Sequence, residues 1–357
     1  MRFPTTSDGK IDEENATKML DLAYESGVNY FDTAYVYHGG DSEVFTGKVL
    51  DRYPRDSYFL ATKLPVWEVN TKEDVERLLD EQLAKLNKDY IDFYLLHALD
   101  GARWDKMEEL GVYEICQQMR EKGKIKYIGF SFHDDYSAFE KIIKAKDWDF
   151  CQIQLNYMDT DIQAGLKGYK LAEDLGIPMV IMEPIKGGNL AALPQEVESI
   201  FKSENSESTV ASWALRWVAS KPNIMTVLSG MSNLEQTQDN LNTFSNFKPM
   251  TDKENELVMK VAETIKSRVA NGCTGCRYCM PCPAGVDIPK CFHIWNQYHM
   301  YMNEGGLGWM WYNEIQESQK PDNCVKCGAC EAACPQKIAI REDLEKLNEE
   351  ITKALRK

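Results

Sequence analysis

The clearest chemical pattern in this chain is a set of eight cysteines that fall in two short runs near its end. The first run reads CTGCRYCMPCP and the second reads CVKCGACEAACP. In each run two residues separate the first three cysteines, and the fourth cysteine stands directly before a proline. Such clustered spacing is typical of metal ligation rather than of disulfides. The eight are Cys273, Cys276, Cys279, Cys282, Cys324, Cys327, Cys330 and Cys334.

The spacing of the second run is that of bacterial ferredoxins. There, three cysteines on one loop bind a cubane cluster, and the cysteine before proline binds the cluster of the other run. We therefore predict two 4Fe-4S clusters. By that exchange one ligand set is Cys273, Cys276, Cys279 and Cys334, and the other is Cys324, Cys327, Cys330 and Cys282. The first run has only two residues before its last cysteine, which leaves this pairing open. Two zinc sites are the alternative, because C-x2-C pairs also bind zinc. The remaining cysteines, Cys116, Cys151 and Cys291, are expected to be small buried residues.

Polar residues stand where apolar runs end in the first part of the chain. Asp32 and Tyr37 lie in FDTAYVYHGGDSE, Lys63 in YFLATKLP and His97 in DFYLLHALD. In a parallel barrel, strand ends form the face on which active sites lie. Taken singly, each residue also has a structural explanation, as a helix cap, rim packing, a surface lysine or a buried histidine.

Short apolar runs that could position these residues recur through the first ~230 residues, each followed by a segment of helical periodicity. Strand and helix alternation predicts parallel pairing. No G-x-G-x-x-G is present, which favours a (β/α)8 barrel over an open dinucleotide-binding sheet. One strand of the eight is missing. The predicted strands are 29–34, 58–63, 92–97, 127–132, 150–156, 178–184 and 224–230.

The chain of 357 residues is long enough for a large domain and a small one. We expect a barrel over residues 1–250, a helical connector over 251–270, and a small α-helical, ferredoxin-like iron-sulfur domain over 271–357, where Cys, Gly, Pro and aromatic residues become frequent.

The charge and composition of the chain indicate where the protein is located and which partners it can bind. The 41 basic and 56 acidic residues give a net charge of −15, which disfavours nucleic acid and anionic membranes as partners. The start lacks the apolar core of a signal peptide, and no apolar run is long enough to span a bilayer. We expect a cytoplasmic protein that binds a small molecule.

The barrel motifs, in content and order, resemble the aldo-keto reductase family from the first residues to about Asn240. Asp32 and Tyr37 match the family's D-T-A-x-x-Y, Lys63 its strand-end lysine and His97 its L-L-H. The resemblance implies a catalytic tetrad that reduces an aldehyde or ketone with NAD(P)H. The tyrosine gives the carbonyl its proton, the lysine beside the aspartate stabilises the phenolate, and the histidine orients the carbonyl oxygen.

The same resemblance implies residues that bind the nicotinamide cofactor. Ser131 and Gln154 match the positions that hold the carboxamide, and residues 230–240 match the segment that holds the adenosine phosphate. An arginine often stands at the position of Gln236, so the choice between NADH and NADPH stays open. The pyrophosphate-loop matches are Glu183, Pro184, Gly187 and Gly188, and the adenosine-segment matches are Gly230, Gln236 and Asn240.

The amino terminus departs from the family pattern. Family members have a short hairpin and a first barrel strand before the segment that matches MRFPTTSDGKIDEENA, and this chain starts inside that strand. We expect that the true start lies upstream of the printed one.

Two functions are compatible with these motifs. The first is a carbonyl reductase that carries clusters for electron relay or for structure. The second is an electron-transfer protein, with a possible redox protein partner, in which the barrel serves for binding or regulation. Hydride carries two electrons together and a cubane accepts one, so direct coupling would need a flavin or radical step. No flavin-binding segment is evident, which favours the first function.

Overall fold

The computed structural model describes residues 2–245 and 247–356. The chain divides into two compact units. The first contains Met1–Gly187 and Ala211–Asp252, and the second contains Gly188–Val210 and Lys253–Lys357. Residues 253–270 therefore belong to the same unit as the cysteine-rich segment, and so do residues 188–210, which follow β6 (Met179–Met182) in the sequence.

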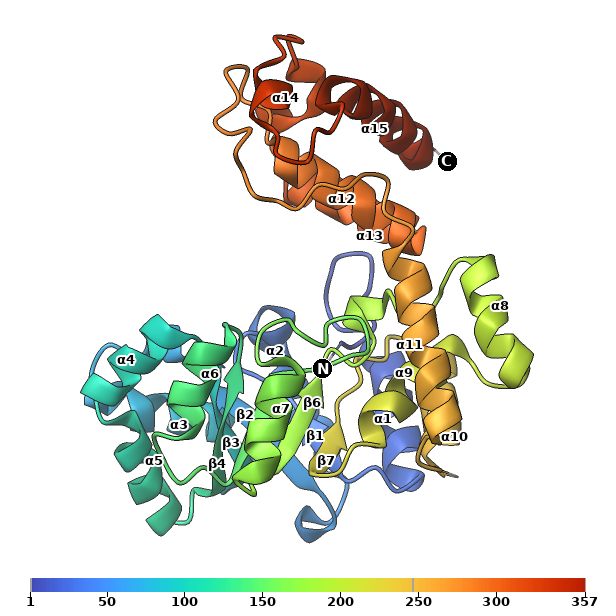
Figure 1. The fold of residues 1–357 in the computed structure, drawn as a ribbon. Helices are drawn as coiled ribbons and strands as arrows, with labels where there is room; N and C mark the ends of the chain where they lie inside the picture. The colour runs from blue at the N-terminus through green and yellow to red at the C-terminus, as the bar shows by residue number, and fades with distance from the viewer. Residues whose placement is uncertain (1, 246, 357) are drawn as a thin grey trace. The chain divides into compact units, whose positions relative to one another are not determined.

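The first unit is built on a parallel sheet of seven strands in the order β1 to β7, which together form a nearly closed barrel. Each predicted strand is found. Figure 1 shows the strands side by side with α3 to α7 outside them. The strands are β1 (Tyr30–Asp32), β2 (Phe59–Leu64), β3 (Ile91–Leu99), β4 (Ile125–Phe132), β5 (Phe150–Gln154), β6 (Met179–Met182) and β7 (Ile224–Val227). The TIM-type barrel predicted from strand and helix alternation is thus confirmed.

The helices of this unit begin at the polar residues that the sequence offers as caps. Thr71 and Asp74 form a capping box at the start of α3, while Asp100 and Asp135 cap α4 and α6 through their side chains. Side-chain caps satisfy backbone N–H groups that have no partner inside the helix. The helices are α1 (Glu13–Glu25), α2 (Asp41–Leu50), α3 (Lys72–Leu86), α4 (Gly101–Glu109), α5 (Val112–Glu121), α6 (Tyr136–Ile143), α7 (Gly165–Asp174), α9 (Val210–Ala219) and α10 (Leu234–Ser245).

Ahead of α1 the chain forms a tight turn rather than a strand. Thr5 and Ile11 form an isolated antiparallel bridge, and Gly9 takes a positive φ of 81° in the turn between them. Among the described residues, the strand order ends at β1 on one side and at β7 on the other. This agrees with a barrel of which one strand is missing.

The second unit is helical, and its apolar core lies between α12, α13 and α15. The buried side chains of this core include Phe292, Trp295, Leu307 and Leu347. Six of the eight clustered cysteines pack against it while partly buried. The helices are α8 (Gln195–Glu204), α11 (Asp252–Lys266), α12 (Ile288–Tyr301), α13 (Glu304–Asn313), α14 (Ala329–Ala333) and α15 (Ile340–Leu355). No helix in the described part of the chain has the length and apolar character needed to cross a bilayer.

Candidate active site and candidate cluster site

Three of the predicted catalytic residues meet at the ends of β1 and β2. Parallel pairing of Asp32 with Ala61 places Lys63 just beyond the end of β1. The Lys63 Nζ atom lies 2.7 Å from Asp32 Oδ1, 2.8 Å from the Thr33 carbonyl oxygen and 3.5 Å from the Tyr37 hydroxyl. Tyr37 begins the 3-10 turn η1 (Tyr37–Gly40), directly after the loop that follows β1. The strand ends thus bring the lysine into contact with both partners.

Lys63 is fully buried and is held as a cation by its neighbours. Burial alone would lower its pKa, because a desolvated ammonium is costly. The charges of Asp32 and Tyr37 and their hydrogen bonds outweigh burial and raise the pKa of Lys63 above its usual value. A positive charge therefore stands beside the Tyr37 hydroxyl, where it would stabilise the phenolate that remains after proton transfer.

His97 lies next to this group and is uncharged. Its ring centroid is 6.0 Å from that of Tyr37 and 5.1 Å from that of Trp67. Burial, and then the positive charges of Lys63, His133 and Arg103, lower the pKa of His97 to about 3. Its buried Nδ1 atom finds no hydrogen-bond partner within the described residues. A neutral imidazole with an unused ring nitrogen can donate to or accept from a substrate oxygen.

Strand β3 continues past His97, where the sequence predicts its end. The strand runs to Leu99, and its pairing with β4 is irregular between Leu96 and Leu99. Ala98 takes a left-handed φ of 53° in this irregular stretch. Ser131, which is buried, accepts a hydrogen bond from the Ala98 amide at 2.7 Å through its Oγ atom. The bend after His97 is thus fixed by a predicted cofactor residue.

Gln154 takes part in a polar network at the end of β5. Its Nε2 atom donates to Asp159 at 3.2 Å, and its Oε1 atom accepts from Gln163 at 3.3 Å. Lys186 contacts the buried Asp159 at 2.6 Å and 2.7 Å. This ion pair links the end of β5 to the loop after β6. The sequence did not predict it, because the two residues are 27 positions apart and their types do not specify that they meet.

The loop after β6 has the backbone of a ligand-binding turn. Glu183, Lys186, Gly187 and Gly188 all have positive φ, between 49° and 104°. At Gly188 an added Cβ atom would meet nothing within 4 Å, so the backbone stands clear of other atoms. Glycines of this kind let a ligand approach the main chain closely. Pro184, which lies between Glu183 and Lys186 in the sequence, is buried.

The segment 230–240 contains the start of α10. Asn233 caps the helix by accepting from the Gln236 amide at 2.8 Å, and Gln236 Oε1 accepts from the Ser232 amide at 2.8 Å. Asn240 donates to the Ser229 hydroxyl at 2.8 Å. Gly230 is exposed and lies against the side chain of Arg2. The side-chain oxygen of Gln236 is thus occupied by a hydrogen bond within the turn.

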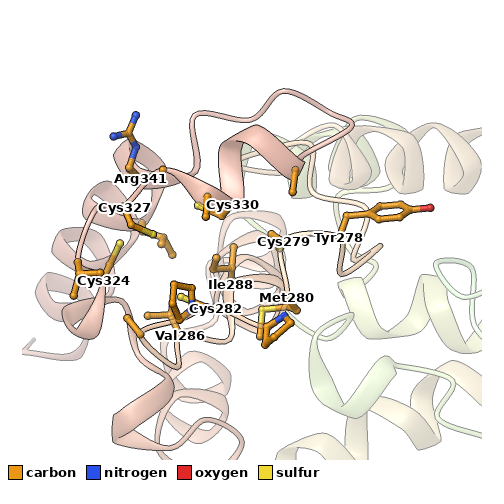
Figure 2. A pocket seen from close by; sticks show the side chains of 18 residues that line it. Tyr278, Cys279, Met280, Cys282, Val286, Ile288, Cys324, Cys327, Cys330 and Arg341 are labelled. Atoms are coloured by element: carbon orange, nitrogen blue, oxygen red, sulfur yellow. The ribbon is translucent and has the colours of Figure 1, made fainter.

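The eight clustered cysteines gather around two cavities in the second unit. A cavity of about 220 Å³ is lined by Cys279, Cys282, Cys324, Cys327 and Cys330. Figure 2 shows these five around the cavity, with the Tyr278 ring pointing away from it. A smaller space is lined by Cys273, Cys276, Cys279 and Cys334. Cys282 therefore lies with the cysteines of the second run, and Cys334 with those of the first.

The segment that leads into the first run is held by a buried asparagine. Asn296, on α12, accepts from the amides of Ala270 and Asn271 at 2.8 Å and 3.0 Å and donates to the Asn271 carbonyl at 3.1 Å. Asn271 in turn accepts from the Cys273 amide at 3.1 Å. The position of Cys273 is thus tied to the helical core.

Binding of any metal centre by these cysteines requires their thiolates. Burial raises the pKa of Cys273, Cys279 and Cys330, so the ligand thiolates would form as metal binds. The other three cysteines are buried, as predicted.

Comparison with known proteins agrees with both parts of this description. Residues 1–263 match the model of the aldo/keto reductase family, and residues 272–339 match that of the 4Fe-4S dicluster domain. The chain therefore belongs to the aldo/keto reductase family. It is an oxidoreductase enzyme that carries a ferredoxin-type 4Fe-4S domain after its barrel.

Individual relatives are distant. The NADH-specific methylglyoxal reductase of Escherichia coli is 22% identical over 306 residues, which cover 72% of this chain and 90% of that protein. L-galactose dehydrogenase of Arabidopsis thaliana is 24% identical, covering 65% of this chain and 79% of its own. The solved structure of an aldo-keto reductase of Bacillus halodurans, in its holo form, superposes on this chain with a TM-score of 0.60. The two chains are 24% identical, and the match covers 70% of this chain and 88% of the other. The likeness to this solved structure shows the fold.

Proposed function

We propose that the barrel reduces an aldehyde or ketone with NAD(P)H, using Asp32, Tyr37, Lys63 and His97. The observation that carries this proposal is the Lys63 ammonium, buried between Asp32 and the Tyr37 hydroxyl. Buried charges persist only where they are paired, and this one is paired on the side of Asp32 and faces a proton donor on the other.

The residues have distinct roles. The Tyr37 hydroxyl gives its proton to the carbonyl oxygen, and the charge of Lys63 stabilises the phenolate that is left. Asp32 keeps Lys63 in place and charged. His97, neutral because its pKa is about 3, hydrogen-bonds the carbonyl oxygen without competing as an acid. A nicotinamide cofactor, when bound, would supply the hydride for the carbonyl carbon.

We further propose that Ser131 and Gln154 bind the nicotinamide end of the cofactor, that Glu183, Pro184, Gly187 and Gly188 bind the pyrophosphate, and that Gly230, Gln236 and Asn240 bind the adenosine end. The positive φ values and open surroundings of the loop after β6 support this. The name of the Escherichia coli relative, an NADH-specific methylglyoxal reductase, supports a small carbonyl substrate. Free clustered thiols and a nicotinamide cofactor fit the cytoplasm.

The second unit is proposed to hold two 4Fe-4S clusters, with Cys282 and Cys334 exchanged between the runs. The grouping of cysteines around the two cavities supports this exchange. Because cubanes carry single electrons, the clusters have a role separate from the hydride step. We also propose that the barrel ends near residue 250, that a helical connector follows, and that the iron-sulfur domain begins near residue 270.

The test compares two tyrosines that lie two residues apart. Tyr37→Phe should lower kcat/KM for aldehydes by about 10²- to 10⁴-fold, the usual contribution of a positioned acid. Tyr35→Phe is the control, because the Tyr35 hydroxyl bonds to Glu81 at 2.9 Å and not to Lys63. The protein is purified anaerobically, and NADH and NADPH oxidation is followed with a panel of aldehydes.

Two results would contradict the reductase proposal: wild type that reduces no carbonyl, or Tyr37→Phe that is as active as Tyr35→Phe. A paramagnetic signal of reduced clusters produced by NAD(P)H alone, without carbonyl turnover, would favour the electron-transfer function instead.

A further inference from the structure

A cation outside the proposed tetrad lies near Trp67, whose ring is in contact with the tetrad's histidine. Arg103 is the third residue of α4, directly after β3. Its Cζ atom is 5.8 Å from the ring centroid of Trp67, whose ring is 5.1 Å from that of His97. A cation in the first turn of a helix is disfavoured by the helix dipole, so the helix itself does not account for this residue.

The contacts of Arg103 hold the side chain in place and leave one edge open. Its Nη1 atom donates to the Ala98 carbonyl oxygen at 2.6 Å, and its Nε atom is 3.4 Å from Asp100 Oδ2. For Nη2, no partner is found within residues 2–245 and 247–356, and the side chain is 42% exposed. The guanidinium therefore offers a free N–H edge to solvent or to a ligand.

The charge of Arg103 is only weakly compensated. A distance of 3.4 Å to Asp100 is longer than the 2.7 to 2.9 Å typical of a strong charge-assisted hydrogen bond. Lys63, by contrast, is 2.7 Å from Asp32. Arg103 also contributes to the lowering of the His97 pKa, which places its charge within electrostatic range of the tetrad.

We propose that Arg103 binds an anionic group of the carbonyl substrate, a carboxylate or a phosphate, and so makes the enzyme selective for oxo acids or phosphorylated aldehydes. This inference rests on the proposed function. The carbonyl oxygen would lie at Tyr37 and His97, the body of the substrate against the half-exposed Trp67, and the anion at the free edge of Arg103. The names of the Escherichia coli and Arabidopsis thaliana relatives do not specify such an anion.

Arg103 could instead act only through the backbone. It holds the carbonyl of Ala98, which has a left-handed φ of 53° directly after His97. Loss of that support would disturb His97 and would slow anionic and neutral substrates alike. If Arg103 binds an anion, its loss should instead change the ratio of kcat/KM for the anionic substrate to kcat/KM for the neutral one. This ratio is the quantity to measure.

The experiment uses pairs of substrates that differ in the anion. Succinic semialdehyde is compared with butanal, and glyceraldehyde 3-phosphate with glyceraldehyde, in the full-length holoenzyme. In wild type, the kcat/KM ratio of anionic to neutral partner should be about tenfold or more in at least one pair, as expected for a charged hydrogen bond. In Arg103→Gln that ratio should fall about tenfold, and in Arg103→Lys it should fall less.

The control is Arg77→Gln, which removes the same charge from the outer surface of α3. Arg77 pairs with Asp74 at 2.8 Å and is 57% exposed. Its ratios should equal those of wild type, which would exclude general electrostatic attraction. The pair that responds distinguishes a carboxylate from a phosphate.

The comparison of wild type with Arg103→Gln decides the inference. Equal ratios in the two proteins overturn it, whether or not Arg103→Gln slows both substrates of a pair in parallel. If wild type reduces no carbonyl, the proposed function fails by itself, and calorimetric titration with succinate and inorganic phosphate then decides. Anion binding that is lost in Arg103→Gln supports the site, and its absence in wild type overturns it.

Discussion

In the barrel, three of the side chains proposed for catalysis, Asp32, Lys63 and His97, come from paired parallel strands, and Tyr37 comes from the turn after β1. In the second unit, seven of the eight clustered cysteines lie in irregular or turn segments, and only Cys330 belongs to a helix, the short α14. The barrel site is therefore positioned mainly by the sheet. The cysteine site is held at few points, such as Asn296, and its bound clusters must contribute to its stability.

The largest expected effect tests how the cysteines are shared. Cys334→Ser should remove one cluster and lower the iron content from about eight to about four per chain, since each cubane has four irons. By the exchanged pairing, adding Cys273→Ala should cost no further iron, whereas adding Cys324→Ala should remove the second cluster. Iron analysis and paramagnetic resonance measure this.

Cys291→Ala is the control for these variants, because Cys291 is buried on α12 and lies outside both runs. It should keep all of its iron. The opposite result would contradict the exchange. If adding Cys273→Ala to Cys334→Ser lowers the iron content further and adding Cys324→Ala does not, each run holds its own cluster.

A smaller effect is expected from the buried ion pair of the barrel. Asp32→Asn leaves the Lys63 charge buried without its counter-ion, which should cost about 3–5 kcal/mol in the free energy of unfolding. Urea unfolding followed by circular dichroism measures it, while cluster absorbance reports the second unit separately. Glu13→Gln, which breaks the exposed Glu13–Lys48 pair, should cost far less. Equal losses in the two variants would show that the barrel site is not held in the way described.

The smallest effect concerns the pH dependence that His97 gives to the barrel. Its pKa is about 3 when folded and 6.5 ordinarily, so below pH 6.5 the unfolded chain binds a proton that the folded chain does not. Stability due to neutral His97 is therefore complete above pH 6.5 and is lost as the pH falls, by up to about 1.4 kcal/mol per pH unit.

The measurement compares the unfolding free energies of wild type and His97→Gln as the pH is lowered from 6.5. Cluster absorbance is recorded at each pH, so that any loss of clusters is detected. As the pH falls, the free energy of unfolding of wild type should decrease more than that of His97→Gln. A difference that is constant with pH would mean that His97 has the same pKa in the folded and unfolded states and is not kept neutral by the fold.

Much of the fold could be predicted because the signals are local. The seven strands are short apolar runs between helical segments, and parallel pairing places their ends on one face. Tyr37 could be distinguished from Tyr35 by its spacing from Asp32, and the structure places only Tyr37 within reach of Lys63. The extension of β3 past His97 was not predicted, because an irregular pairing between Leu96 and Leu99 has no periodic signal.

The sequence by itself determined the barrel, the tetrad candidates and the cysteine runs, because each depends on the type and spacing of residues close together in the chain. Tertiary structure decided which residues from distant segments meet: Asp159 with Lys186, Trp67 with Arg103, and Cys282 with the second run. Such contacts depend on side-chain direction and loop path, which periodicity does not specify. The fold alone therefore placed Arg103 near Trp67, which contacts His97.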